Sequence, residues 1–210
     1  AGEEIAALLK KAGEEDIVIA LISGGASALL VDCPPGASLP EIQQVFSQLL
    51  ACGATIGEMN TVRKHLSPGI KSGQLVPNAH PATLVSFILS DVPGDQLDII
   101  ASGPTVPDPS TFKDAWYILE KYNLVHSLPK SIEDWLLEGV QKIIPDTPKP
   151  GDPIFAHSHT FLIGSNHIAL QAARAKAQQL GYNTSILSET LTGEARVKAV
   201  DMLQTILDYD

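Results

Sequence analysis

The sequence contains few cysteines and few aromatic residues. Two of its 210 residues are cysteine and 5% are aromatic. Cys33 and Cys52 lack the spacing of a metal site, and we interpret them as the reduced thiols of a cytoplasmic protein. No stretch approaches the ~20 apolar residues of a membrane span, and no signal peptide is recognisable. We therefore expect a cytoplasmic globular protein, with further residues upstream of Ala1 because the chain opens without methionine.

Basic residues are also scarce. The chain has 14 lysines and arginines against 24 aspartates and glutamates, and its formal net charge is −10. This balance argues against nucleic acid or an anionic membrane surface as a partner. It leaves room for a small anionic ligand, because local hydrogen-bond donors decide such binding. The 44% of hydrophobic residues, mostly aliphatic, are typical of α/β proteins.

The sequence lacks the Gly-x-Gly-x-x-Gly turn, the Walker loop and the Gly-x-Ser-x-Gly elbow. It has instead Ser23, Gly24 and Gly25 directly after the apolar run 17–22. The N–H groups of such a turn can face an anion, and its glycines have no Cβ to block the approach. A strand-to-helix turn without a ligand explains the same residues, so the turn alone leaves both interpretations open.

Hydrophobic patterning predicts helices that alternate with strands. The expected helices are 3–13, 38–52, 54–66, 111–122, 131–144, 167–180 and 194 to the end, and the expected strands are 16–22, 83–89, 160–164 and 182–187. Ser131 is expected to cap its helix. This order favours one α/β domain over residues 1–210, a Rossmann-like three-layer sandwich with a mostly parallel sheet that is covered on both faces. Because residues 16–22 are apolar without alternation, we expect that strand to be fully buried.

Polar side chains follow three of the expected strands. Ser23 follows the first strand, Ser90 and Asp91 follow the second, and Ser165 and Asn166 follow the third. Ligands of parallel sheets bind at the carboxyl ends of the strands, so these turns are candidates for one site. Helix capping alone also places Ser and Asn at such positions.

Other polar groups are possible parts of this site. Asp91 and Asp95 lie four residues apart, a pair that can hold Mg²⁺ beside phosphates, although an Asx-turn explains them too. Asn60 shares a helical face with Arg63 and Lys64, which can bind a carboxylate or phosphate or form an ordinary solvated face. The loop 102–111 has three prolines and is equally consistent with recognition and with a stiff connection. The six histidines form no convincing ligand set.

A series of motifs in fixed order covers nearly the whole chain. They are Leu21-Ile22-Ser23-Gly24-Gly25-Ala26-Ser27-Ala28-Leu29-Leu30, Gly53-Ala54-Thr55-Ile56, Asn60-Thr61-Val62-Arg63-Lys64-His65-Leu66-Ser67, Ile88-Leu89-Ser90-Asp91-Val92 with Gly94-Asp95, Ile100-Ala101-Ser102-Gly103-Pro104-Thr105-Val106 with Asp108-Pro109, Ile163-Gly164-Ser165-Asn166 and Gly193-Glu194-Ala195. Together they resemble the class II glycerate kinases, whose second domain is called MOFRL and which are also described as hydroxypyruvate reductases. The resemblance implies ATP-dependent phosphorylation of D-glycerate, typically to 2-phosphoglycerate. It also implies a Rossmann-like amino-terminal domain that faces a smaller carboxyl-terminal domain across a cleft.

The resemblance also suggests roles for individual residues. ATP would bind at Ser23, Gly24, Gly25, Ser27, Ser90, Ser165 and Asn166, the acid at Asn60, Arg63, Ser102 and Thr105, and Mg²⁺ at Asp91 and Asp95, with Arg63, Lys64 and Asp91 as the catalytic residues. The expected partners are D-glycerate and ATP, and a homodimer is left open. A hydroxypyruvate reductase and a non-catalytic binding module are the alternatives, although a reductase needs a dinucleotide turn that the chain lacks.

The chain departs from the family pattern in three loops. Ala26 stands where a third glycine is usual, Ser72 stands in place of the first glycine of a pair, and the turn at Pro68 and Gly69 is one residue longer. An upstream segment containing Gly-Lys and the whole MOFRL domain would lie outside residues 1–210. We therefore expect a fragment of the enzyme, one that can be inactive alone.

Overall fold

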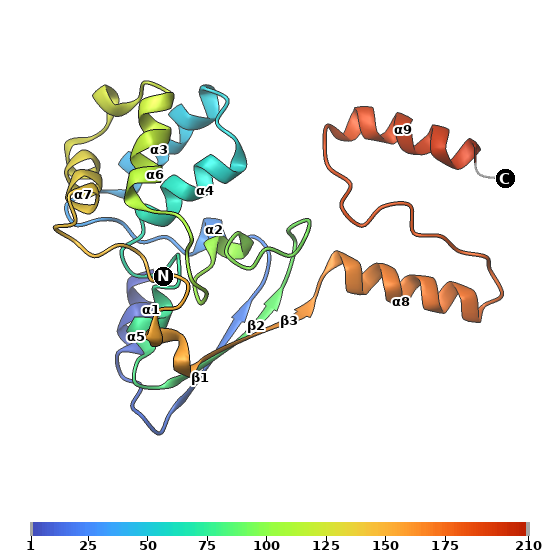
Figure 1. Cartoon of the computed structure of the whole chain (residues 1–210), viewed down its shortest axis with the longest axis horizontal. Helices are drawn as coiled ribbons and strands as arrows, with labels where there is room; N and C mark the ends of the chain where they lie inside the picture. The colour runs from blue at the N-terminus through green and yellow to red at the C-terminus, as the bar shows by residue number, and fades with distance from the viewer. Residues whose placement is uncertain (1, 209–210) are drawn as a thin grey trace.

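The structure, a computed structural model, describes residues 2–208. It contains a three-stranded parallel sheet in the order β1 (Ile17–Ile22), β2 (Thr83–Leu89) and β3 (Ser158–Gly164), flanked by helices (Figure 1). The predicted α/β class and parallel sheet are confirmed. Because all three strands run the same way, the turns that follow them meet at one edge.

The seven predicted helices are present within a few residues of their predicted bounds, whereas the short helices Ala26–Leu29 and Leu75–Ala79 were not predicted. The helices are α1 (Gly2–Leu9), α2 (Ala26–Leu29), α3 (Leu39–Ala51), α4 (Ile56–His65), α5 (Leu75–Ala79), α6 (Phe112–Lys121), α7 (Lys130–Val140), α8 (Asn166–Gln179) and α9 (Ala195–Leu207), with 3₁₀ turns η1 (Ile100–Ser102), η2 (Val125–Ser127) and η3 (Pro153–His157). The capping box of Ser38 and Glu41 is confirmed at the start of α3. The prediction that Ser131 caps α7 is wrong, because the helix already begins at Lys130, after Pro129.

Two bodies of packed side chains make up most of the fold. Helices α3, α4, α6 and α7 enclose their own core around Val45, Leu49 and Leu136. The second body is the sheet, of which one face packs on α1 and α5 through Leu84 and on α2 and η1 through Ile88. The amino end of α4 is held by a capping box between Thr55 and Glu58, so the helix that carries Arg63 and Lys64 is anchored at its start.

The opposite face of the sheet is exposed in the described residues. Ile17, Ile19 and Leu21 are 68%, 62% and 78% exposed, and Phe161 is 51% exposed. The predictions that β1 is fully buried and that both faces are covered are therefore wrong within residues 2–208. The physical reason is topological: right-handed crossovers between strands in the order β1-β2-β3 all pass over the same face.

Residues 182–187 do not form the predicted strand. A strand needs the backbone groups of a neighbouring strand, and α8 leads the chain away from β3 (Figure 1). The segment instead links α8 to α9, and Ile186 and Leu187 line a hollow with Leu170 of α8 and Met202 of α9.

Candidate functional site

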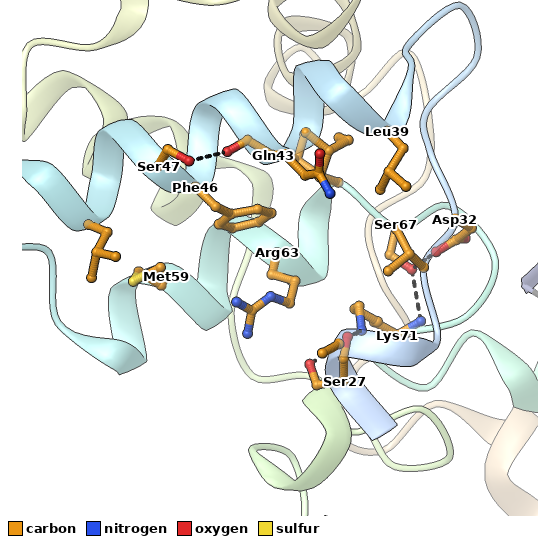
Figure 2. A pocket seen from close by; sticks show the side chains of 15 residues that line it. Ser27, Asp32, Leu39, Gln43, Phe46, Ser47, Met59, Arg63, Ser67 and Lys71 are labelled. Atoms are coloured by element: carbon orange, nitrogen blue, oxygen red, sulfur yellow. Dashed lines mark hydrogen bonds between the residues drawn. The ribbon is translucent and has the colours of Figure 1, made fainter. Parts of the chain in front are cut away.

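A pocket of about 560 Å³ lies between α2, α3, α4 and the segment that follows α4. Figure 2 shows its two kinds of wall. The apolar wall includes Leu39, Ile42, Phe46 and Met59, and the polar wall includes Ser27, Asp32, Arg63, Ser67 and Lys71. The pocket therefore offers positive charge beside an apolar surface.

Lys71 lies at the base of the polar wall and is only 3% exposed. Its Nζ atom donates to the carbonyl oxygen of Ser27 at 2.8 Å and lies 3.4 Å from Ser27 Oγ. The Ser27 hydroxyl is in turn 2.8 Å from the hydroxyl of Ser102, which is fully buried. A chain of polar contacts thus runs from the pocket into the interior.

The proline-rich loop holds the backbone around Lys71 in place. The N–H groups of Ser72 and Gly73 donate to the carbonyl oxygens of Ser102 and Gly103 at 2.9 and 2.7 Å. Leu75 N–H donates in the same way to Pro104. The loop with three prolines therefore fixes the backbone of the segment that carries Lys71 into the pocket.

Burial and charge act together on the two cations of the pocket. Burial, with a smaller effect from the charge of Arg63, lowers the pKa of Lys71 from 10.5 to about 8, and Asp32 opposes this shift. Burial also lowers the pKa of Arg63. Asp32 is itself engaged, since it accepts hydrogen bonds from the hydroxyl of Ser67 and the N–H of Gly69.

Arg63 extends across the pocket from α4. Its Nη1 atom donates to Asn60 Oδ1 at 2.6 Å, as their spacing on one helical face predicted, and its guanidinium lies 4.9 Å from the centre of the Phe46 ring. Neither Arg63 nor Lys71 makes an ion pair with a carboxylate of the described residues. Buried charges are normally paired, so a bound anion would supply the negative charge that these two cations lack at ion-pair distance.

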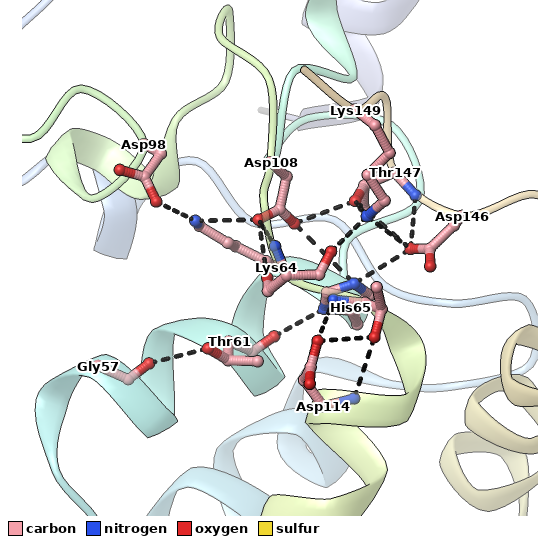
Figure 3. A network of polar contacts seen from close by, with 12 residues as sticks. Gly57, Thr61, Lys64, His65, Asp98, Asp108, Asp114, Asp146, Thr147 and Lys149 are labelled. Carbon is pink, nitrogen blue, oxygen red and sulfur yellow. Dashed lines mark hydrogen bonds and ion pairs between the residues drawn. The ribbon is translucent and has the colours of Figure 1, made fainter. Parts of the chain in front are cut away.

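Lys64 points away from this pocket into a buried polar network (Figure 3). Its Nζ atom lies 3.0 Å from Asp98 and 3.2 Å from Asp108, and the Lys64 and Asp108 side chains are 4% and 0% exposed. Burial alone would raise the pKa of Asp108, but the charge of Lys64 and two hydrogen bonds from Ser110 outweigh it and lower that pKa. These contacts favour a structural role, and the catalytic role of Lys64 stays a prediction.

The same network includes His65, which follows Lys64 on α4. His65 Nε2 lies 3.2 Å from Asp146, and its Nδ1 lies 2.9 Å from the carbonyl oxygen of Thr61. Thr147 donates to Asp108 at 3.0 Å. The network joins α4 to the loops on both sides of α6 and α7, and so fixes the helix that carries Arg63.

The turn after β1 packs directly against the turn after β2. A Cβ at Gly24 would collide with the carboxylate of Asp91, so only glycine permits this approach. Gly25 has φ +79°, in the left-handed region that favours glycine. Ser23, Gly24, Gly25 and Asp91 are all exposed, which leaves this edge of the sheet open to a ligand.

The other predicted residues lie in varied surroundings. Ser90 N–H donates to Gly164 at 2.8 Å, which joins the ends of β2 and β3. Ser165 caps α8, and the Asn166 amide donates to the carbonyl oxygen of Glu189 at 2.7 Å. Thr105 is 1% exposed, and its hydroxyl has no hydrogen-bond partner. The binding roles of these residues stay predictions.

Few side chains in the described part of the chain are placed to bind a magnesium ion. No group of three or more His, Cys, Asp or Glu side chains within residues 2–208 could hold a metal ion. Mg²⁺ bound beside phosphates needs only one or two carboxylates. Asp91 fits that kind of site, because it is exposed and its carboxylate lies next to Gly24. Asp95 lies in the following turn with φ +53°.

Sequence patterns missed Lys71, Phe46 and Asp32 as parts of the pocket. Lys71 lies six residues after the end of α4, outside any helix or strand whose periodicity could place it. Its contact with Ser27 spans 44 residues, so sequence spacing could not predict it. The signal that could have found it is its place in the family motif, directly before Ser72 and Gly73.

A family model described as "Domain of unknown function (DUF4147)" matches residues 1–137. The chain belongs to this family. A "Putative hydroxypyruvate reductase" of Agrobacterium vitis is 46% identical over 93% of the chain and 42% of the relative, and a "Glycerate 2-kinase" of Pyrococcus horikoshii is 43% identical over 92% of the chain and 43% of the relative. The crystal structure of a glycerate kinase from Thermotoga maritima has a TM-score of 0.82 at 36% identity, covering 99% of the chain and 47% of that protein.

These matches confirm the resemblance to the amino-terminal part of glycerate kinases. The chain spans less than half the length of the relatives named above. In the described part of the chain, no helix has the length and apolar character needed to cross a membrane.

Proposed function

We propose that the protein phosphorylates D-glycerate with ATP and forms 2-phosphoglycerate. The observation that carries this proposal is the pair of cations, Arg63 and Lys71, that face one pocket beside the glycine turn after β1. Within residues 2–208, neither lies within ion-pair distance of a carboxylate. Phosphoryl transfer depends on positioned charge more than on covalent chemistry by the protein. The glycerate kinase names of similar proteins support the same conclusion.

The edge of the sheet supplies the second part of the proposed site. Gly24 and Gly25 are exposed residues, and their N–H groups would donate to phosphate oxygens. Further polar contacts would come from Ser23, Ser27, Ser90, Ser165 and Asn166. Asp91, with Asp95 as a second candidate, would hold Mg²⁺. The ion would neutralise charge on the transferred phosphoryl group.

The acid would lie between this edge and α4. Arg63, with Asn60 beside it on α4, would supply positive charge to the phosphate groups that react with this acid. Ser102 and Thr105 are buried beneath this region, so their part would be to hold Ser27 and the adjoining loop in position.

We also propose that residues 1–210 form one α/β domain that works with a second domain of the kind the resemblance implies. The exposed apolar face of β1 and β3 supports this, since an isolated soluble protein rarely exposes so continuous an apolar surface. Another part of a longer polypeptide would cover it.

The test is turnover. The 210-residue chain, alone and joined to the remaining length of a relative such as the Pyrococcus protein, is incubated with ATP, Mg²⁺ and D-glycerate, and phosphorus NMR identifies the product. We expect 2-phosphoglycerate from the joined protein. NADH oxidation with hydroxypyruvate and no ATP consumption would replace the proposal with the reductase alternative, for which the Agrobacterium relative is named.

A further inference from the structure

We propose that the pocket between α3 and α4 holds the base and ribose of a purine nucleotide, with the nucleotide's phosphates on Arg63 and Lys71. This inference rests on the proposed function and deepens it, because it assigns the nucleotide, rather than the acid, to this pocket. Its occupant is thus a nucleoside di- or triphosphate.

The apolar wall distinguishes the two ligands. Leu39, Ile42, Phe46 and Met59 line one side of the pocket, and a hydroxy acid such as glycerate has no apolar group to place against them. A purine ring gains from such a surface, because its flat faces bury well against aliphatic and aromatic side chains. The volume of about 560 Å³ also lies in the range of pockets that enclose drug-sized ligands.

The charged wall suits the other end of the nucleotide. Figure 2 shows the Arg63 guanidinium below the Phe46 ring and the Lys71 side chain beside Ser27, on the same polar wall of the pocket. Arg63 brings a planar fork of donors and Lys71 a compact charge, a combination that suits successive phosphate groups. Charge complementarity therefore fixes the orientation, with the base near Phe46 and the phosphates near Lys71.

The chain connectivity gives the direction of the phosphates. Ser27, which accepts the hydrogen bond of Lys71, lies two residues after Gly25. A phosphate chain that starts at Lys71 would reach the N–H groups of Gly24 and Gly25 next, and then Asp91, which contacts Gly24. The last phosphate would then lie at the exposed edge of the sheet, where the acid can approach.

The experiment measures binding rather than turnover. The 210-residue chain is titrated with a fluorescent N-methylanthraniloyl ADP, and the variants Phe46→Ala, Arg63→Gln and Lys71→Met are compared with Tyr117→Ala, Arg196→Gln and Lys176→Met. The control residues are exposed and lie outside the pocket. We expect each pocket variant to weaken binding by about 10-fold or more, because the Arg63 and Lys71 variants lose a charge-assisted hydrogen bond and the Phe46 variant loses aromatic contact with the base. Each control should bind like the original chain. Circular dichroism checks folding, and if Lys71→Met does not fold, Phe46→Ala and Arg63→Gln still decide the question.

A competition arm separates the two ligands. Unlabelled ADP should displace the probe, and D-glycerate should not. Displacement by D-glycerate, or nucleotide binding that is insensitive to all pocket variants, would overturn the assignment while leaving glycerate phosphorylation intact. Absence of probe binding to the original chain would also overturn it. Pocket-dependent ADP binding without any 2-phosphoglycerate from the joined protein would instead sustain this inference and refute the proposed reaction.

Discussion

The ammonium of Lys71 donates a hydrogen bond to the carbonyl oxygen of Ser27 at 2.8 Å, across 44 residues of sequence. The contact connects the segment after α4 to α2, the short helix that follows the glycine turn after β1. Lys71 is buried, and among the described residues only the more distant charge of Asp32 acts to keep it protonated, against burial and the charge of Arg63. Its charge is therefore held at a cost that an anionic ligand would offset. This relationship makes the pocket sensitive to pH.

Nucleotide affinity should fall as pH rises above about 8. The pKa of Lys71 is lowered to about 8, so its side chain is charged below that pH and loses its proton above it. An anion favours the charged form, and binding is therefore strongest on the acid side of this transition. Arg63 and Asp32 are the other charged groups that act on Lys71. Titrations with the fluorescent ADP between pH 7 and 9.5 measure the effect.

Lys71→Met is the decisive variant for this pH dependence. Its affinity should be lower at pH 7 and nearly constant up to pH 9.5. If the variant keeps the same decline as the original chain, the titrating group is not Lys71.

Ser72→Gly should stabilise the protein. Ser72 has φ +61°, and its hydroxyl is buried without a hydrogen-bond partner. The left-handed backbone costs a residue other than glycine about 1–2 kcal/mol, whereas the greater flexibility of unfolded glycine costs about 0.5–1 kcal/mol. We expect a net gain of about 1 kcal/mol in the free energy of unfolding, measured by urea denaturation. Ser47→Gly, inside helix α3, should destabilise, and a loss in both variants would contradict the strain at Ser72.

Much of the fold could be predicted from local patterns. The apolar runs located β1, β2 and β3, and the capping box at Ser38 located the start of α3, because each depends on a few neighbouring residues. The predicted strand 182–187 failed because a strand depends on a partner that lies elsewhere. The exposed face of β1 was missed for a similar reason, since an apolar run does not show whether anything covers it.

In the candidate site, too, contacts within one helix could be predicted from the sequence and contacts between distant segments could not. Helical spacing correctly paired Asn60 with Arg63, because both lie on one helix. It could not show that neighbouring Lys64 turns toward Asp108, 44 residues away, or that Lys71 meets Ser27. Long-range contacts of this kind depend on the packing of loops, which have no period that a sequence pattern can detect.

Lys64→Met should strongly destabilise the protein. The substitution leaves the fully buried carboxylate of Asp108 without its main counter-charge, and breaking a buried pair from one side costs about 3–5 kcal/mol. Urea denaturation measures the change. Lys130→Met is the matched control, because Lys130 is 74% exposed and its ion pairs with Glu133 and Asp134 should contribute less than about 1 kcal/mol. A Lys64→Met variant with unchanged stability and lost turnover would favour the catalytic role instead.

Gly24→Ala should disturb the turn after β1 through Asp91. The added methyl group would collide with the Asp91 carboxylate and lie within 3 Å of its Cβ, and overpacking of this kind costs about 1–3 kcal/mol. Combining Gly24→Ala with Asp91→Gly removes the obstacle, so the double variant should be less destabilised than the sum of the two single variants. Gly57→Ala is the control, because the nearest atom to its new Cβ is 4.0 Å away. Urea denaturation of the four proteins gives the coupling energy, and additive effects would show that the two turns do not meet as described.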